Sequence, residues 1–377
     1  MAATWTYHNP VQVFCGRGAR KMVSEVLNGK QVLVVCSQRG KEQFTGDPIL
    51  KGIGRGTNIE WMDNVKANPG LDKLQSDIDR LTGASFDAVV GFGGGSAIDS
   101  AKALSIGLSA KKSDHTLTHV IDNPSLLQRM HSIPVVAVPT TSGTGSEVTP
   151  FATIWNHRQK KKLSLSGPAV YARTAVVDPE LTDNLPQAET IYTGMDAINQ
   201  AAESIWNKNA TPLSIMYGTE SLRKGLKALL ILNDGKGGAV ERDAMAESSL
   251  LAGLAISQTR TALCHSISYP LTAQFGVPHG LACAFTMAQV LKLNLEGHPY
   301  RFDVLSKALG VSSVTAVFDD FAKRMGIDFR IREYISDWEQ IVPLIPEMFT
   351  PGRADNNIAD VDETKIEMLL KASWKID

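Results

Sequence analysis

Four side chains in the second half of the sequence have the chemistry of metal ligands. Asp196 lies in the stretch TGMDAINQAAES, which has the pattern of a helix start, and Gln200 follows one turn later on the same face. His265 and His279 lie near the ends of apolar helical segments and are flanked by small residues. Because neutral imidazoles bind Fe, Zn and Ni well, the set predicts three metal ligands, with Gln200 as a neutral fourth. An ordinary helix start is the alternative for Asp196, since the helix dipole favours an acid in the first turn.

A glycine-rich stretch, GFGGGSAIDSAKAL, is expected between a strand and a helix. Gly94, Gly95 and Ser96 would bring backbone N–H groups at a helix N-terminus close to a phosphate. The usual dinucleotide fingerprint is not matched here, and a plain turn is the alternative. On the following helix, Asp99 is a candidate cofactor contact. Lys102 is interpreted as part of a salt link on the face of that helix.

A second loop, PTTSGTGSEVTPF, follows another apolar run. Its hydroxyl groups and glycines suit contacts with a ribose, a phosphate or a nicotinamide. A polar turn that only ends a strand is an equal alternative. The candidate cofactor contacts in this loop are Thr140, Thr141, Ser142 and Thr144.

These residues need a scaffold, and the sequence predicts two domains. The first half contains short Val-rich runs typical of buried parallel strands, in KQVLVVCS, FDAVVGFGGG, SIPVVAVP and ARTAVVDPEL, with helix-compatible sequence between the first two. This alternation predicts an α/β domain with a parallel sheet over residues 1–185. Residues 186–377 have helical periodicity and predict an all-α domain, with a ligand-binding cleft between the two.

Composition excludes several classes of function. The formal net charge is −1, from 38 basic and 39 acidic residues, which gives no electrostatic case for binding nucleic acid or an anionic membrane. No apolar run approaches the ~20 residues that span a bilayer, and the N-terminus lacks the pattern of a secretory signal. The cysteines form no C-x-x-C pair, so we expect free thiols in a cytoplasmic protein; they are Cys15, Cys36, Cys264 and Cys283.

Taken together, the motifs resemble the iron-containing (group III) alcohol dehydrogenase family. The matching segments are GGGSAIDSAKAL, PTTSGTGSEVTPFA, VDPELT, GMDAINQAAES and HSISYPLTAQFGVPHG, in this order. The resemblance implies a dinucleotide-binding α/β domain, a helical domain, and a divalent metal (Fe²⁺ or Zn²⁺) in the cleft, as in the dehydroquinate synthase-like architecture. It also implies NAD(P)H as cofactor, a small aldehyde or alcohol as substrate, and a homodimer.

Within that family the metal ligands are an Asp, a His one helical turn later, and two further His. These positions correspond to Asp196, Gln200, His265 and His279, so the resemblance implies that Gln200 replaces the second ligand. We therefore expect weaker metal binding, or a reaction that proceeds without metal.

Further segments, including ESIWNKNATPLS, are similar to phosphonoacetaldehyde reductases, which make 2-hydroxyethylphosphonate. An anionic substrate needs cationic or amide donors. Arg260 and Asn207 are the candidate substrate contacts, and Asn207 is placed on the helical face of Gln200 by its seven-residue spacing. Lys162 is assigned to the cofactor, because a cationic side chain would also suit the cofactor phosphates. Solvated polar residues are the alternative for each.

The expected reaction is reversible hydride transfer between a nicotinamide and an aldehyde. A metal held by ligands such as His265 would polarise the aldehyde oxygen. Tyr269 stands where many family members have a further histidine suited to proton relay, so it either donates a proton or only packs. At the end of the first predicted strand, NAD-specific relatives tend to carry an acid that accepts hydrogen bonds from the ribose hydroxyls. This chain has Ser37 and Arg39 there, and the arginine could pair with a 2′-phosphate. The sequence therefore favours NADPH, with NADH also usable.

The sequence is also compatible with three other functions. The chain can be a polyol dehydrogenase or a dehydroquinate synthase-type enzyme, a general dehydrogenase for short aliphatic aldehydes, or a nucleotide-binding homologue that lost catalysis with the change at Gln200.

Overall fold

The computed structural model describes residues 4–159 and 161–374, which form two compact units. The α/β unit comprises Asn9–Thr141 and Gly145–Leu185. The helical unit comprises residues 186–374 together with residues 4–8 and the short segment Ser142–Thr144. The second predicted loop is thus divided between the units.

The α/β unit is built on a sheet of six parallel strands, which confirms the predicted fold class. The four predicted strands correspond to β2, β4, β5 and β8. The two strands that the sequence did not reveal, β1 and β3, are the edges of the sheet and are partly exposed, so they lack a continuous apolar run. In sheet order the strands are β1 (Gln12–Cys15), β8 (Thr174–Val177), β5 (Val135–Pro139), β4 (Ala88–Gly93), β2 (Gln31–Val35) and β3 (Asn58–Met62).

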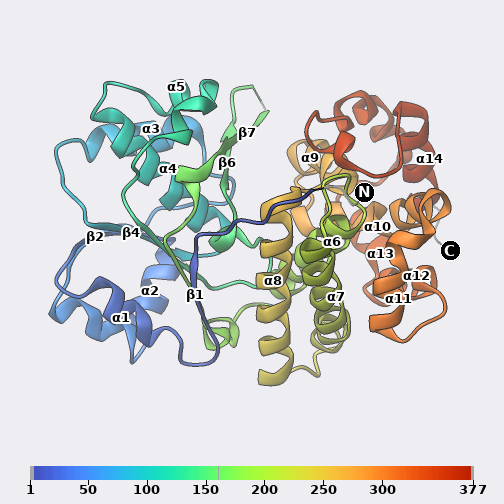
Figure 1. Cartoon of the computed structure of the whole chain (residues 1–377), viewed down its shortest axis with the longest axis horizontal. Helices are drawn as coiled ribbons and strands as arrows, with labels where there is room; N and C mark the ends of the chain where they lie inside the picture. Colours follow the sequence, from blue (N-terminus) through green and yellow to red (C-terminus); the bar gives the residue numbers. More distant parts are fainter. Residues whose placement is uncertain (1–3, 160, 375–377) are drawn as a thin grey trace. The chain divides into compact units, whose positions relative to one another are not determined.

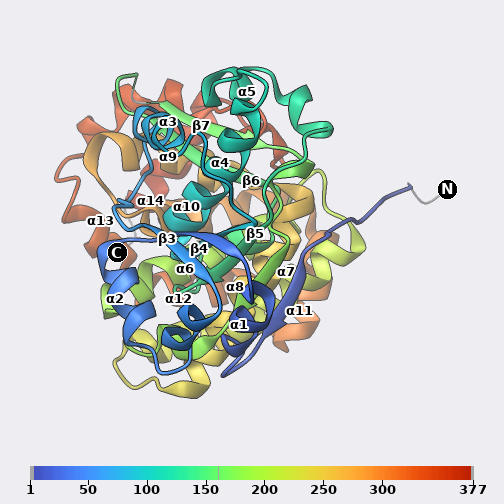
Figure 2. The same ribbon diagram turned by 90° about the vertical axis from the view of Figure 1, so that its left-hand side faces the viewer.

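Helices cover both faces of this sheet (Figures 1 and 2). Along β2, Leu33 and Val35 pack in the core under α3 and α4, whereas Val32 and Val34 point to the opposite core under α1 and α2. The helices are α1 (Lys21–Leu27), α2 (Gln38–Gly46), α3 (Leu71–Arg80), α4 (Gly95–Lys111) and α5 (Leu117–Asp122). A hairpin of β6 (Phe151–Asn156) and β7 (Lys161–Ser166) completes the unit.

The helical unit contains α-helices and short 3-10 turns. The apolar segment from Ala244 to Ser268 is divided between two helices, because the chain turns at Arg260, where φ is 63°. The helices are α6 (Gln187–Ile205), α7 (Pro212–Asn233), α8 (Ala239–Thr259), α9 (Leu263–Phe275), α10 (His279–Gly297), α11 (Asp303–Leu309), α12 (Val314–Arg324), α13 (Ile327–Arg332) and α14 (Glu363–Trp374).

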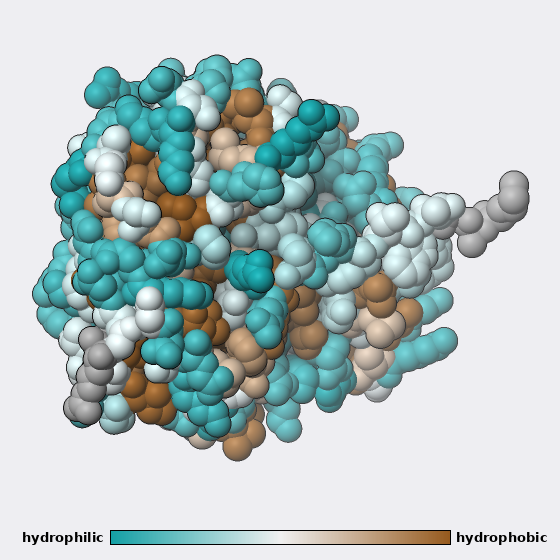
Figure 3. All heavy atoms as spheres, turned by 60° about the vertical axis from the view of Figure 1, so that its left-hand side comes forward, coloured by the Kyte–Doolittle hydropathy of each residue, from teal (hydrophilic) through white to brown (hydrophobic). Residues whose placement is uncertain are grey.

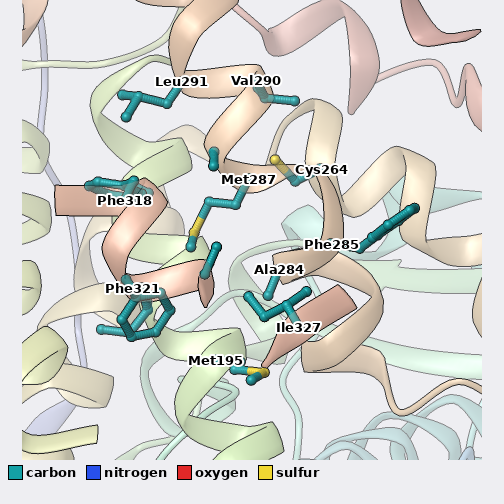
Figure 4. Close-up of a cluster of buried hydrophobic side chains, with 14 of the residues drawn as sticks. Met195, Cys264, Ala284, Phe285, Met287, Val290, Leu291, Phe318, Phe321 and Ile327 are labelled. Carbon is teal, nitrogen blue, oxygen red and sulfur yellow. The ribbon is translucent and has the colours of Figure 1, made fainter. Parts of the chain in front are cut away.

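One apolar core holds these helices together. Figure 4 shows part of it, where Met287 of α10, Phe318 and Phe321 of α12 and Met195 of α6 turn toward a common interior. Burying such side chains contributes about 1.5–3 kcal/mol each relative to exposure. This packing fixes α6, α9 and α10, the three helices that carry the predicted metal ligands.

Hydrophilic side chains cover most of the molecular face in Figure 3, with hydrophobic residues in smaller groups between them. Among the described residues, no helix combines the length and the low polarity needed to cross a membrane.

Candidate metal centre and cofactor loops

Three of the predicted metal ligands come together in the helical unit. Asp196, His265 and His279 form a group with Cys283 in which one donor atom of each residue lies within 4.8 Å of the others. The Asp196 Oδ1 atom is 3.3 Å from His265 Nε2, and the Cys283 Sγ atom is 3.8 Å from His279 Nε2. The fourth member, Cys283, was not recognised from the sequence, although it follows His279 by one helical turn on α10.

Asp196 does not lie at a helix start. Helix α6 begins at Gln187, so Asp196 is in its middle and only 4% of its surface is exposed. The helix-dipole explanation for this acid is therefore wrong, because the dipole acts within the first turn. A buried carboxylate needs a partner, and the imidazoles of His265 and His279 lower the pKa of Asp196 against the opposing effect of burial.

Glu203 fixes the orientation of His265. Its fully buried carboxylate accepts a hydrogen bond from His265 Nδ1 at 2.7 Å, and it also accepts the backbone N–H groups of Ala262, Cys264 and His265 at the start of α9. With Nδ1 bound to Glu203, the Nε2 atom is the one that faces Asp196. The sequence signal for Glu203 was its spacing of seven residues from Asp196, which is two turns along one face of α6.

Close approach of α10 to α6 places His279 and Cys283. A Cβ atom on Gly280 would lie 1.8 Å from the backbone oxygen of Tyr192, so only glycine fits directly after His279. One turn later, Asn199 Nδ2 of α6 donates to the Cys283 backbone oxygen at 3.0 Å. The two contacts hold this face of α10 against Asp196.

The donor group is electrostatically suited to a cation. Burial disfavours the charged form of His265, but the neighbouring Cys283, Glu203 and Asp196 raise its pKa well above the ordinary value. Likewise, although burial acts in the other direction, His265 and His279 lower the pKa of Cys283 to about 7. Two anionic donors and two imidazoles match the ligand types of a divalent transition metal.

Gln200 lies beside this group, with its amide held by the second loop. Its Nε2 donates to the Thr144 backbone oxygen at 3.3 Å, and its side chain also hydrogen-bonds Asp196. Its Oε1 is buried without a hydrogen-bond partner among the described residues. The loop can approach α6 because residue 143 is glycine, since a Cβ there would lie 2.6 Å from the Thr193 Cβ.

In the α/β unit the glycine loop joins β4 to α4 as predicted. Gly94 is the N-cap of α4 and Gly95 and Ser96 open the helix, which has no acidic residue in its first turn. The first N–H groups of a helix have no partner within it, so the loop fits a pyrophosphate. Position 93 also requires glycine, although Gly93 was not among the predicted contacts. Its φ is 144°, and a Cβ there would lie 2.9 Å from the Ala97 Cβ.

The first part of the second loop lies next to this glycine turn. The Thr140 N–H donates to the Gly93 oxygen at 3.0 Å. The Thr141 side chain lies 3.4 Å from the position that a Cβ on Gly94 would occupy. Ser142 and Thr144 belong to the helical unit instead.

Asp99 and Lys102 tie the loop and the hairpin to α4. The Asp99 carboxylate accepts the Ser146 hydroxyl and the Thr153 N–H. The reading of Lys102 as a salt link on the helix face is wrong, because it is 1% exposed and its Nζ donates to three backbone oxygens, those of Ser146, Thr149 and Phe151. Lys162 lies in β7, and its charge acts on Asp99.

At the end of β2, Ser37 caps α2 by accepting the Gly40 N–H, and Arg39 is exposed in the first turn. As predicted from the sequence, no acid directly follows β2. A carboxylate, that of Asp63, does follow the neighbouring β3, and burial and then the charge of Asp63 raise the pKa of Cys36 to about 12. Lys41 lies 2.6 Å from the Asp63 carboxylate and offsets its charge.

The two predicted substrate contacts have different surroundings. Helix α6 ends at Ile205, so the prediction that Asn207 continues the face of Gln200 is wrong. Asn207 is fully buried, donates to the Arg260 backbone oxygen at 3.3 Å and accepts the Asn209 N–H at 2.9 Å. Its amide therefore shapes the turn that carries Arg260.

Arg260 is exposed at the end of α8, and partial burial of its guanidinium, followed by the charge of Arg353, lowers its pKa. Arg353 Nε in turn donates to the Tyr269 hydroxyl at 3.3 Å. The Tyr269 ring is stacked on that of His279, with centroids 6.2 Å apart at 17°. Arg353 was missed because it lies in an irregular segment far along the chain, without a motif around it.

Comparison with known proteins places these features in a family. Residues 10–179 match the model described as iron-containing alcohol dehydrogenase, and residues 190–374 match the C-terminal model of the same family. The chain is 36% identical to a phosphonoacetaldehyde reductase from Streptomyces viridochromogenes over 64% of this chain and 60% of that protein. It is 28% identical to a sulfoacetaldehyde reductase from Bilophila wadsworthia, over 88% of this chain and 86% of the relative.

A solved structure covers the whole length. The crystal structure of sulfoacetaldehyde reductase from Bifidobacterium kashiwanohense in complex with NAD⁺ matches with a TM-score of 0.88 and 25% identity, covering 100% of both chains.

Proposed function

Because this chain belongs to the iron-containing alcohol dehydrogenase family and is an NAD(P)-dependent alcohol dehydrogenase or aldehyde reductase, we propose that its substrate is a small aldehyde with an anionic group. We propose phosphonoacetaldehyde as the preferred substrate and 2-hydroxyethylphosphonate as the product. Phosphonoacetaldehyde and sulfoacetaldehyde, the compounds in the names of two relatives, are both two-carbon aldehydes that carry an anion.

The observation that carries this proposal is the link from Arg353 to the donor group, together with the effect of its charge on a second arginine, Arg260. Arg353 is linked through Tyr269 to the ring of His279, and the charge of Arg353 acts on Arg260. Two neighbouring guanidinium groups repel each other, and a bound dianion removes that repulsion. Guanidinium groups also bind phosphonate oxygens through paired, charge-assisted hydrogen bonds.

Three predicted ligands, Asp196, His265 and His279, would hold a divalent metal. When bound, such a metal withdraws electron density from an aldehyde oxygen as a Lewis acid. Glu203 keeps His265 in the tautomer whose Nε2 faces the group. Tyr269 positions Arg353, and through it the anionic end of the substrate, at a fixed distance from His279.

The nicotinamide cofactor supplies the hydride, and the α/β unit would bind its phosphates. Gly94, Gly95 and Ser96 at the start of α4 would receive the pyrophosphate, with Thr140 and Thr141 beside them.

We propose a preference for NADPH. Arg39 is exposed one residue after the start of α2, where a 2′-phosphate can pair with it. Lys41 offsets the charge of Asp63, the carboxylate that would otherwise oppose a 2′-phosphate at this strand end.

The test is a comparison of aldehydes with the whole protein, reloaded with Zn²⁺ or Fe²⁺ and supplied with NADPH. Phosphonoacetaldehyde, sulfoacetaldehyde and propanal are compared by kcat/KM, and the phosphorus product is identified by ³¹P NMR. We expect both anionic aldehydes to exceed propanal and 2-hydroxyethylphosphonate to appear in step with NADPH consumption. Equal values for all three would overturn the proposed substrate class.

A further inference from the structure

We propose that Cys283 provides the fourth metal ligand as a thiolate, in the role that the family resemblance assigns to a histidine at the position of Gln200. This inference rests on the proposed metal dependence but not on the proposed substrate. It changes the donor set from one carboxylate and three imidazoles to a carboxylate, two imidazoles and a thiolate.

The distances within the donor group support a common metal position. Two nitrogen or oxygen ligands about 2.0 Å from a tetrahedral metal lie about 3.3 Å apart, and a thiolate at about 2.3 Å lies about 3.6 Å from a nitrogen ligand. Asp196 Oδ1 and His265 Nε2 are 3.3 Å apart, and Cys283 Sγ and His279 Nε2 are 3.8 Å apart. Since all four donor atoms lie within 4.8 Å of one another, only small side-chain movements would bring them onto one ion.

Helix α10 carries both His279 and Cys283 to the donor group. Residues four apart lie on one face of a helix, and this face of α10 is held against α6 by the Gly280 contact and by the Asn199 hydrogen bond to the Cys283 oxygen. Cys264, the other buried cysteine of the helical unit, belongs instead to the hydrophobic core with Met287 and Phe285, as Figure 4 shows.

Gln200 makes its hydrogen bonds through its amide nitrogen and not through its oxygen. The Thr144 oxygen and the Asp196 carboxylate both accept hydrogen bonds, so each faces an N–H of Gln200. An amide nitrogen that carries two hydrogens has no lone pair to give to a metal. Its role is therefore to hold Asp196 and the Thr144 loop in place, and its unpartnered Oε1 is the competing donor that an experiment must exclude.

A thiolate ligand has two chemical consequences. The donor set carries a formal charge of −2 instead of −1, so a divalent cation is neutralised and the polarisation of a substrate oxygen is weaker. Thiolates also favour Zn²⁺ and Co²⁺ over harder cations such as Mn²⁺. We therefore expect this enzyme to select zinc over manganese more strongly than its Cys283→Ser variant does.

The experiment uses the whole protein, stripped of metal and reloaded with Co²⁺ or Zn²⁺. A thiolate bound to Co²⁺ gives a near-ultraviolet charge-transfer band, which nitrogen and oxygen ligands do not. We expect the band in the wild type and in the matched control Cys264→Ala, and its loss in Cys283→Ser. Zinc affinity, measured by competition with a chromophoric chelator, should fall by about 10- to 100-fold or more in Cys283→Ser.

Two further variants separate the competing donors. Gln200→His in the Cys283→Ser background should restore zinc affinity without restoring the band, because it rebuilds a set with three imidazoles. Gln200→Ala should keep the band. In the wild type, Zn²⁺ should slow alkylation of Cys283 relative to the exposed Cys15, a measurement that does not depend on the folding of any variant.

The proposal is overturned if wild-type Co²⁺ protein has no thiolate band and zinc does not protect Cys283 from alkylation. It is also overturned if Gln200→Ala loses zinc affinity while Cys283→Ser keeps it, which would make the Gln200 oxygen the ligand. Aldehyde turnover is recorded separately, so a thiolate band without phosphonoacetaldehyde reduction would refute the proposed function and leave this inference standing.

Discussion

Glu203 Oε2 and His265 Nδ1 are joined by a hydrogen bond of 2.7 Å, and this contact decides which ring nitrogen of His265 faces Asp196. The same carboxylate accepts three backbone N–H groups at the start of α9. A single buried acid thus sets both the helix end and the ligand orientation.

We predict that Glu203→Gln weakens metal binding by about 10- to 100-fold, the usual effect of losing such an outer partner. The amide NH₂ of glutamine would face backbone N–H groups, so unfolding should also become easier. Zinc affinity and urea unfolding check both effects, with the half-buried Glu220→Gln on α7 as the matched control. Wild-type zinc affinity in Glu203→Gln would show that Glu203 only caps the helix.

Tyr269→Phe separates positioning from proton donation. The phenyl ring can keep its stacking on His279, but Arg353 loses the hydroxyl that it binds. If Tyr269 positions Arg353, KM for phosphonoacetaldehyde should rise several-fold while kcat for propanal stays within about twofold. A fall in kcat for both aldehydes would instead identify Tyr269 as the proton donor.

The stability of the α/β unit should depend on pH through Glu147. Burial, opposed in part by its own backbone and by Lys102, raises the pKa of Glu147 from 4.5 to about 7 in the folded protein. The folded state therefore binds more protons than the unfolded state between these values, so this contribution to stability is complete below pH 4.5 and is lost as the pH rises through about 7.

Glu147→Gln should thus be more stable than the wild type at about pH 8, by on the order of 1–3 kcal/mol, with a smaller difference at about pH 5. The gain is limited because the Glu147 charge also supports Lys102, whose pKa burial lowers to about 8. Urea unfolding at the two pH values is the measurement. A difference that does not change with pH would contradict the assigned pKa.

Cofactor preference should respond to Ser37. An aspartate at this position keeps the N-cap of α2 but adds a carboxylate that accepts ribose hydroxyls and repels a 2′-phosphate. We expect Ser37→Asp to raise the ratio of kcat/KM for NADH over NADPH by about tenfold or more. The control Thr45→Asp places the same charge at the exposed end of α2 and should leave the ratio unchanged.

The sequence alone predicted what depends on local pattern. Buried runs such as that of β2, the glycine turn before α4, and the histidines of α9 and α10 are all recognisable without tertiary structure. Asp196 lies within the donor group. Its predicted helix start was misplaced, because α6 continues back through weakly patterned residues to Gln187.

The features that were missed depend on contacts between distant segments. Cys283 looked like an ordinary free thiol until the packing of α10 on α6 placed it beside His279. Lys102 was expected to form a salt link on the helix face, but its Nζ donates to backbone oxygens of the loop after β5 and of β6. Arg353 could not be identified from the sequence, because its hydrogen bond to the Tyr269 hydroxyl joins residues that are 84 positions apart.

The most direct test of the proposed specificity is the ratio of kcat/KM for phosphonoacetaldehyde over propanal, measured for the wild type, Arg260→Ala and Arg353→Ala. Charge-assisted hydrogen bonds to an anion contribute ~1.5–3 kcal/mol each, so each replacement should lower the ratio by about tenfold or more. The exposed Arg223→Ala on α7, which removes the same charge away from the donor group, should leave the ratio at the wild-type value. A wild-type ratio near one, or a ratio that neither replacement changes, would contradict the assignment of the two arginines to an anionic substrate.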